Sequence, residues 1–449
     1  MARTLGRGGK LKVAIADDSG LIFSDDYRSG WTEGFRAVGA EVKVFDISML
    51  RRMRHSVRSP YRSITMPGTQ KGLAGNITAW GADLVWCHHG RAASNPEFLA
   101  GLKKGGAVTA VYLCDEPYET GETAKYSPGF DYVFTMDPCT VEVHRKSRPR
   151  RNNVFYLPPG VDTNLFKPRP YYNKAGELQR KTPAFFLGNA SLIPRPEWLK
   201  PIERLVDGAD IRFFNTVGKN DKRWIPAQDH PKWYGGCVVG LNVHRSPVIT
   251  MECFKMRVLG RGPHDRIPAG ITLCAQMPRR QGTGFWNDGN LPAAHVNPRF
   301  LEMAACSTLV VSDNDRSELA RMFPMAPRAD DPDHFYELVT HYINHPDEAE
   351  WIGQTCSSLI SRRHSYAHRA AEVAIRLGFR GSLKDDLLSY LGPQEDWLTP
   401  QDCGPLGIES FLARTGRSER WSPQLGMSLT RVSGSPSDSD SIDVQTPWL

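Results

Sequence analysis

The stretch HVNPRFLEMAACSTLVVSD, residues 295–313, contains the strongest local folding signals in the chain. Asn297 is a favoured residue just before a helix, and Pro298 suits the first helical position because its missing N–H would have no partner inside the helix. The run STLVVSD at 307–313 has the apolar, β-branched character of a buried strand. The stretch therefore predicts a helix followed by a strand, as in an α/β domain.

Arg299 and Glu302 lie three residues apart on the polar face of this predicted helix. A helix start offers free backbone N–H groups and the positive end of the helix dipole, which together suit a diphosphate. Arg299 can add two charge-assisted hydrogen bonds, and Glu302 can accept hydrogen bonds from both ribose hydroxyls. The pair predicts a nucleotide site, although the same spacing also fits an ordinary surface ion pair.

The alternation of strand-like and helix-like segments continues on both sides of this stretch. Short apolar runs upstream predict strands at 184–188, 211–215 and 237–244. Downstream, DHFYELVTHYINH at 333–345 has apolar residues at i, i+3, i+4, i+7 and i+8, which predicts a helix with one face packed on a sheet. We therefore predict a C-terminal Rossmann-like domain over 183–375.

A similar pattern fills the N-terminal third of the chain. Apolar runs that end in polar residues predict strands at 11–16, 41–47, 83–89, 107–115 and 131–137. The opening β-α-β unit predicts parallel pairing, and hence a Rossmann-like domain over 11–157. Ligand-binding residues of such sheets lie at the carboxyl ends of the strands, where this sequence has Asp17, His88 and Asp115.

Composition predicts what surrounds the two domains. Residues 158–182 are rich in Pro and Lys without periodicity, which predicts a linker. Residues 1–10 are predicted to be a flexible basic terminus, and 426–449, rich in Ser, Asp and Gly, a disordered tail. The segment 376–425, of mixed composition, lies between the C-terminal domain and the tail. Whether it packs back on the N-terminal domain is left open.

Bulk properties set the broad class of protein. The chain has 449 residues, of which 40% are hydrophobic and 23% charged, which is ordinary globular composition. No run of about 18 apolar residues occurs, so we expect no membrane span, and the absence of a secretory signal predicts a cytoplasmic location. The net charge of +7 favours anionic partners without choosing among them.

An ordered series of motifs resembles a known family. NPRFLE at 297–302, SDNDRSELARMF at 312–323, HYINHP at 341–346 and RRHSYAHR at 362–369 look like the C-terminal domain of the CgeB-like (spore maturation protein) glycosyltransferases. GLNVHRS at 240–246 and FFLGNASLIPRPEWL at 185–199 resemble earlier segments of the same domain, and CDEPYE at 114–119 resembles part of the N-terminal one. The resemblance implies the GT-B type, with two Rossmann-like doubly wound domains that face a cleft.

The resemblance also implies a set of site residues. It places a nucleotide-diphosphate sugar at the carboxyl edge of the second sheet, with no permanently bound cofactor. The donor-binding residues so predicted are Gly188, Arg195, His244, Arg245, Asn297, Arg299 and Glu302. Catalysis needs a base for the acceptor proton, for which the candidates are Asp115, Asp17 and His88. Asp115 fits best because it ends a strand before Glu-Pro-Tyr, although it could instead cap the next turn.

Several alternatives stay open at this point. A β-α-β opening also suits a nucleotide-dependent oxidoreductase, but ADDSG stands where a GxGxxG would follow the first strand. A non-catalytic nucleotide- or nucleic-acid-binding protein would explain the basic clusters. The sequence leaves open whether the acceptor is nucleic acid, protein or glycan. It also leaves open whether the segment 258–296 is a lid, an acceptor-binding element or a surface insertion. Without an isolated Asp-x-Asp pair at a strand end, we predict no essential metal.

Overall fold

The computed structural model describes residues 10–18, 24–50, 69–90, 92–149, 151–188, 194–213, 225–247, 287 and 291–379. The predictions for the tail 426–449, for nearly all of 1–10 and 376–425, and for most of 258–296 lie outside these residues. The chain divides into a unit of residues 1–397, which contains all of the described residues, and a unit of residues 398–449.

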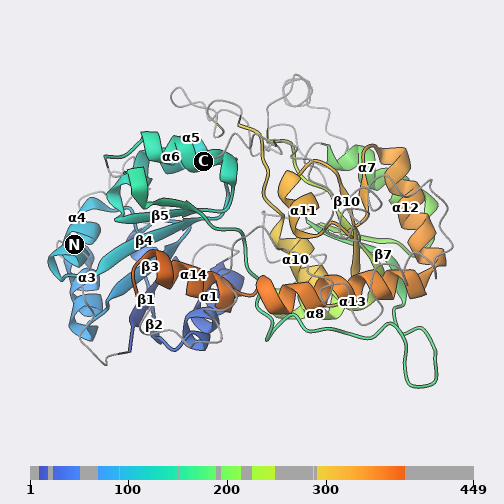
Figure 1. Cartoon of the computed structure of the whole chain (residues 1–449), viewed down its shortest axis with the longest axis horizontal. Coiled ribbons are helices and arrows are strands. Elements are labelled where there is room, and N and C mark those ends of the chain that lie inside the picture. The colour runs from blue at the N-terminus through green and yellow to red at the C-terminus, as the bar shows by residue number, and fades with distance from the viewer. Residues whose placement is uncertain are drawn as a thin grey trace, which may run out of the picture. The chain divides into compact units, whose positions relative to one another are not determined.

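The first sheet is parallel throughout and has six strands in the order β2-β1-β3-β4-β5-β6 (Figure 1). These strands are β1 (Lys12–Asp17), β2 (Glu41–Asp46), β3 (Leu84–His88), β4 (Val108–Leu113), β5 (Tyr132–Thr135) and β6 (Val154–Tyr156). Its helices are α1 (Ser24–Ala37), α3 (Thr69–Trp80), α4 (Pro96–Lys104), α5 (Thr120–Tyr126) and α6 (Val141–Lys146). The five strands predicted from sequence are confirmed, and β6 is an addition.

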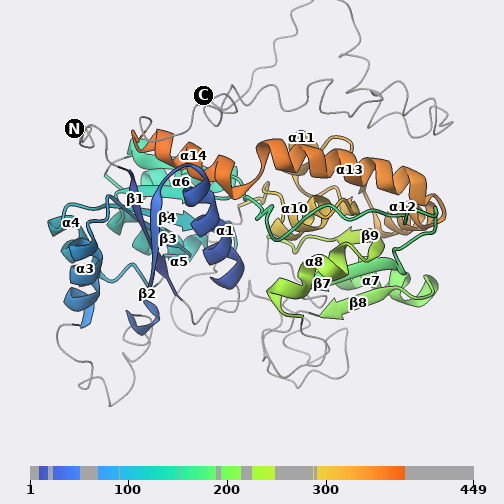
Figure 2. The same cartoon turned by 90° about the horizontal axis from the view of Figure 1, so that it is seen from below.

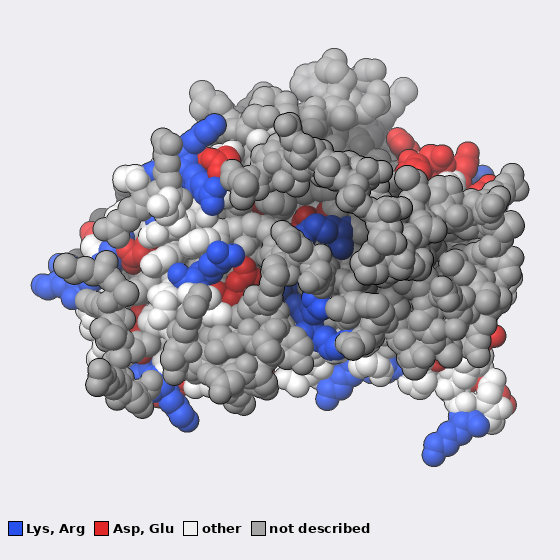
Figure 3. Space-filling view, viewed as in Figure 1, with Lys and Arg blue, Asp and Glu red and all other residues white. Residues whose placement is uncertain are grey.

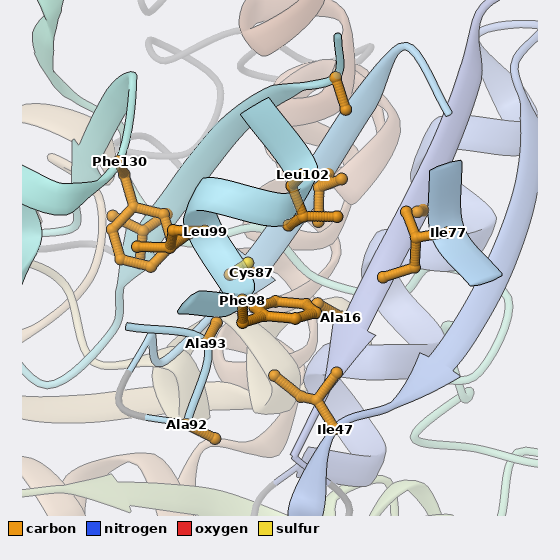
Figure 4. Close-up of a cluster of buried hydrophobic side chains, with 14 of the residues drawn as sticks. Ala16, Ile47, Ile77, Cys87, Ala92, Ala93, Phe98, Leu99, Leu102 and Phe130 are labelled. Atoms are coloured by element: carbon orange, nitrogen blue, oxygen red, sulfur yellow. The ribbon is translucent and has the colours of Figure 1, made fainter. Parts of the chain in front are cut away.

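Each face of the first sheet is covered by its own apolar cluster. On one face, Phe98 and Leu102 of α4 and Ile77 of α3 pack over Ala16 and Cys87 of the central strands (Figure 4). On the other face, an aromatic cluster joins α1 to the sheet; its members include Trp31, Phe35, Trp86 and Tyr112. Helices on both faces make the sheet doubly wound, as predicted.

The second sheet is also parallel, with five strands in the order β11-β10-β9-β7-β8. These strands are β7 (Thr182–Gly188), β8 (Asp210–Phe213), β9 (Cys237–Asn242), β10 (Leu309–Asp313) and β11 (Arg328–Ala329). Its helices are α7 (Arg195–Leu205), α8 (His230–Tyr234), α10 (Pro298–Ala305), α11 (Ser317–Met322), α12 (Pro332–Asn344) and α13 (Pro346–Arg363), most of them visible in Figure 2. The prediction of two Rossmann-like α/β sheets is therefore confirmed.

Helix α14 (Tyr366–Arg376) packs on the first sheet although it follows the second in sequence. Its residues Ala370 and Val373 are fully buried in the aromatic cluster with Trp31. It crosses α1 at Gly34, where an added Cβ would lie 2.6 Å from the backbone oxygen of Tyr366. The predicted domain 183–375 contains this helix, so a segment assigned to the second domain by sequence completes the core of the first sheet.

A buried arginine fixes the predicted linker to the second sheet. Arg180 is 2% exposed and stacks on Tyr171, with its guanidinium carbon 3.7 Å from the ring centroid. Its guanidinium donates to the carbonyls of Cys237 (2.8 Å) and Arg169 (2.7 Å) and to the hydroxyl of Thr308 (2.6 Å). A charge that is buried with this many hydrogen bonds holds the linker in one path.

Within the described residues, no helix is both long and apolar enough to cross a membrane. The cytoplasmic location stays a prediction.

Candidate functional site

The strand order places the predicted residues at the point where each sheet changes winding direction. In the first sheet the chain runs from β1 outward to β2 and returns on the other side to β3. In the second, it runs from β7 to β8 and returns to β9. Crevices at the carboxyl ends of such strand pairs are where doubly wound sheets bind ligands. Asp17 and His88 lie at the first, and Gly188 and His244 at the second.

Three arginines lie at the carboxyl edge of the second sheet. Arg195 begins α7, and its Nε donates to the carbonyl of Val243 just after β9 (2.7 Å). Arg299 lies at the start of α10, and its Nη1 donates to the carbonyl of Leu187 in β7 (2.9 Å). Arg245 follows β9. Carbonyls at the carboxyl ends of β7 and β9 thus orient two guanidinium groups at the same sheet edge.

Gly188 makes room for one of these arginines. A Cβ at position 188 would lie 2.1 Å from Nη1 of Arg299, well inside van der Waals contact. Gly188 therefore acts through its lack of a side chain, which lets the guanidinium lie against the end of β7.

The three cations repel one another. Burial, together with the charges of Arg299 and Arg245, holds the pKa of Arg195 well below its ordinary value. Burial also lowers the pKa of Arg299, and the charge of Arg245 adds to this effect. A bound anion would offset this repulsion, so the crevice suits a phosphate or diphosphate.

Helix α10 begins as the sequence predicts. Asn297 is its N-cap, and the side-chain Oδ1 accepts from the backbone N–H of Arg299 (2.9 Å) and from its Nε (3.3 Å). Glu302 lies one turn further along the helix, where its Oε2 accepts from the hydroxyl of Tyr234 (3.3 Å). The Glu302 side chain lines a small cavity, together with Gly160, Val161, Asp162, Leu165, Phe166 and Tyr366.

A carboxylate of the first sheet anchors the segment that leads into α10. Asp137, fully buried after β5, accepts hydrogen bonds from the backbone N–H groups of Ala294 (2.9 Å) and His295 (3.2 Å). It also contacts Nδ1 of His295 at 2.8 Å. These bonds fix the chain just before the N-cap, although nothing in the sequence pairs residue 137 with this segment.

His244 is buried, and both of its ring nitrogens face protein groups. Nδ1 is hydrogen-bonded to Asp313, and Nε2 lies 3.4 Å from the side-chain amide of Asn242. Burial outweighs the charge of Asp313 and lowers the pKa of His244 to about 4, so the ring is neutral at neutral pH. The arrangement holds the end of β9 against the end of β10. A direct contact of His244 with the donor stays a prediction.

Asp115 lies between residues of both sheets. Its Oδ2 is 3.0 Å from Nε2 of His89, and its Oδ1 is 3.7 Å from Nη2 of Arg245. Burial favours the protonated carboxyl group, but the hydrogen bond and charge of His89 and the charge of Arg245 outweigh it and hold the pKa of Asp115 well below its ordinary value. The side chain remains 41% exposed. Asp115 is thus an ionised, accessible carboxylate beside the arginine cluster.

The other two base candidates form a separate buried group. Asp17 is 1% exposed, and its carboxylate lies 3.2 Å from both Nε2 of His88 and Nη1 of Arg28. The ring of His88 stacks on Tyr27. The structure therefore does not bring Asp17 and His88 into the group around Asp115, and their catalytic role stays a prediction.

Sequence reasoning missed three residues of this site. His89 directly follows His88, which is the strand-end candidate by sequence. Tyr118 stacks on Arg245, with the guanidinium carbon 3.5 Å from the ring centroid, and its hydroxyl accepts from Arg316 (2.8 Å). Tyr118 lies in the CDEPYE segment at 114–119. Arg316, which is 1% exposed, has no sequence signal for a functional role beyond its place after a strand.

Figure 3 shows the described lysines and arginines of one face, which lie in several small groups, some of them beside acidic side chains. The basic segments 51–62 and 278–281 lie outside the described residues.

Comparison with known proteins gives one family match. Residues 283–374 match the model of the glycosyl transferase-like family, a segment that contains Asn297, Arg299 and Glu302. No curated protein matches the chain. Membership of the CgeB-like family stays a prediction.

Solved structures similar to the chain include the following two. HepE from Anabaena, in complex with UDP-glucose, has a TM-score of 0.47 and 11% identity, and the match covers 82% of this chain and 99% of that one. Sucrose-phosphate synthase from Thermosynechococcus elongatus has a TM-score of 0.46 and 9% identity, with 82% and 98% covered.

Proposed function

We propose that the protein transfers a sugar from a nucleoside-diphosphate donor to an acceptor hydroxyl or amine. The observation that carries the proposal is the group of three arginines, Arg195, Arg245 and Arg299, at the winding change of the second sheet. The match of residues 283–374 to a glycosyl transferase-like family supports it independently. That match favours sugar transfer over the oxidoreductase and the non-catalytic binding protein.

The donor half of the proposed site has two parts. The arginines bind the diphosphate, and they offset the negative charge that it gains when its bond to the sugar breaks and it keeps the electron pair. Glu302 accepts from the ribose hydroxyls. The N-terminus of α10, capped by Asn297, adds the positive end of its dipole.

On the acceptor side, Asp115 takes the acceptor proton as the new bond to the sugar forms. His89 and Arg245 keep Asp115 ionised at neutral pH, so it is in the state that can accept a proton. Its position next to Arg245 places it beside the proposed diphosphate site. We propose no metal for this step, since the arginines supply the positive charge.

Donor binding provides the first test. The purified protein is screened by calorimetry against a panel of nucleotide sugars that includes UDP-glucose, with NAD(H) as the competing ligand class. For the donor that binds, Glu302→Ala should weaken affinity by about 1.5 to 3 kcal/mol, the usual loss for charged hydrogen bonds. Glu337→Ala, an exposed change on α12, is the matched control. Affinity within twofold of wild type would contradict the ribose assignment. Binding of NAD(H) alone would contradict the proposed function.

The proton acceptor is tested with Asp115→Asn. Transfer should fall by about two to four orders of magnitude while donor affinity stays nearly constant, because general-base catalysis is worth that much and the base contacts the acceptor. Asp46→Asn, at the exposed end of β2, is the control. Unimpaired transfer would move the base to Asp17 or His88, and a matching loss of thermal stability would indicate a capping role.

A further inference from the structure

His89, Cys114 and Asp115 form a cluster of potential metal ligands at the edge of the first sheet. His89 follows β3, while Cys114 and Asp115 follow the adjacent strand β4. One nitrogen, one sulfur and one carboxylate oxygen from these residues all lie within 4.8 Å of one another. The cluster joins residues that sequence spacing alone, with no Cys-x-x-Cys or His-x-x-His pattern, does not connect.

The backbone holds the imidazole of His89 in place. His89 has a φ of 70°, in the left-handed region that residues other than glycine seldom adopt. Two hydrogen bonds stabilise it there: its N–H donates to the carbonyl of Tyr112 (2.9 Å), and its carbonyl accepts from the hydroxyl of Tyr126 (3.1 Å). A side chain held by its surroundings in a costly conformation is pre-organised for whatever it contacts.

The separation of the nitrogen and oxygen ligands suits a small divalent cation. Nε2 of His89 and Oδ2 of Asp115 are 3.0 Å apart. In a tetrahedral zinc site, bonds of about 2.0–2.1 Å place two such ligand atoms about 3.3 Å apart, so this pair needs a shift of only tenths of an ångström. The sulfur of Cys114 lies within 4.8 Å of a ligand atom of each. Arg245 approaches the other carboxylate oxygen, Oδ1, which leaves Oδ2 for the ion.

We propose that His89, Cys114 and Asp115 bind a thiophilic divalent cation, with Zn²⁺ the best fit. A donor set of one imidazole, one thiolate and one carboxylate suits zinc, whereas Mg²⁺ and Ca²⁺ prefer oxygen ligands alone. The partial exposure of Asp115 leaves the fourth position to water. The site shares Asp115 with the sugar transfer proposed above, so an ion bound there would occupy the proposed base and inhibit transfer.

Binding displaces the proton of the Cys114 thiol, which passes to the buffer as the metal–sulfur bond forms, and His89 binds as the neutral imidazole.

Cobalt gives a direct test, because a thiolate bound to Co²⁺ produces a sulfur-to-metal charge-transfer absorption. Metal-free protein is titrated with Co²⁺ under reducing, anaerobic conditions and then with Zn²⁺. We expect one equivalent of Co²⁺ with the charge-transfer band, and its displacement by Zn²⁺. Absence of the band in the wild-type protein would overturn the proposal.

Variants identify the ligands, since the chain has nine cysteines. Cys114→Ser should abolish the band, whereas Cys139→Ser, a half-buried cysteine after β5, should keep it. His89→Asn should weaken Zn²⁺ binding at least tenfold, and it tests the site even if Cys114→Ser fails to fold. A band that persists in Cys114→Ser, or unchanged zinc affinity in His89→Asn, would refute the site whatever the outcome of the donor-binding assays.

Discussion

Gly188 shows how the absence of a side chain shapes the proposed donor site. The nearest atom to an added Cβ is the far end of a flexible side chain, Nη1 of Arg299, which can move away. The change should therefore affect the position of the guanidinium far more than the stability of the sheet.

Gly188→Ala should weaken binding of the donor by about tenfold to a hundredfold, as expected for the loss of one well-placed charged hydrogen bond. The melting temperature should change little. Calorimetry with the donor and thermal unfolding without it measure the two effects, and Gly72→Ala, with open space around it, is the control. Unchanged affinity would mean that Arg299 does not contact the donor.

The pair His89 and Asp115 makes stability depend on pH. The pKa of His89 is raised from 6.5 to about 9: burial lowers it, but the hydrogen bond and charge of Asp115 raise it more. A group whose pKa is raised by folding stabilises the fold fully below its unfolded pKa, and this contribution is lost as pH rises through the folded pKa.

The stability difference between wild type and His89→Asn should thus be largest near pH 6 and shrink toward pH 9.5. Asn is chosen because it tolerates the left-handed conformation of residue 89. Chemical denaturation at several pH values measures the difference, which should stay within about 1 kcal/mol because Asp115 is partly exposed to solvent. A difference that grows with pH would contradict the assignment of a protonated His89.

At the scale of elements, the crossing of α1 and α14 depends on a small residue. A Cβ at Gly34 would lie 2.6 Å from the backbone oxygen of Tyr366 and 2.8 Å from its carbonyl carbon. Backbone atoms in a helix cannot move aside individually, so the two helices would have to separate.

Gly34→Ala should therefore destabilise the protein by about 1–3 kcal/mol, the usual cost of overpacking, even though alanine favours helices. Gly72→Ala, in α3 with no neighbour within 4 Å, should be neutral or stabilising by up to about 1 kcal/mol. Urea unfolding of both variants provides the comparison. Equal stabilities would show that the helices do not pack this closely in solution.

Local signals account for the elements that the sequence predicts well. The start of α10 depends on Asn297 and Pro298, which act on their own helix. Their effect can therefore be predicted from the local sequence alone. The packing of α14 on α1 depends instead on the fit between Gly34 and Tyr366, which only the folded chain brings together. Periodicity identifies such a helix but cannot choose its partner.

For the molecule as a whole, some features of the candidate site follow from local sequence, and others arise only when the two sheets pack together. Arg299 and Glu302 follow from helix capping and spacing, and each sheet edge follows from the strand pattern. The contacts that join the sheets do not: Tyr118 with Arg316, and Asp137 with His295, pair residues from different sheets. Their partners are set by how the two sheets pack, which no local pattern encodes.

The passage of α14 back to the first sheet affects how the two halves could be exchanged between related proteins. The core around Trp31 is built from two separate pieces of chain, residues up to Leu157 and residues from Tyr366 onward. A chimera that joins the second sheet of this protein to a foreign first sheet therefore needs two junctions, one in the linker and one between α13 and α14. A single-junction chimera would leave the foreign sheet facing a helix that was shaped for a different surface.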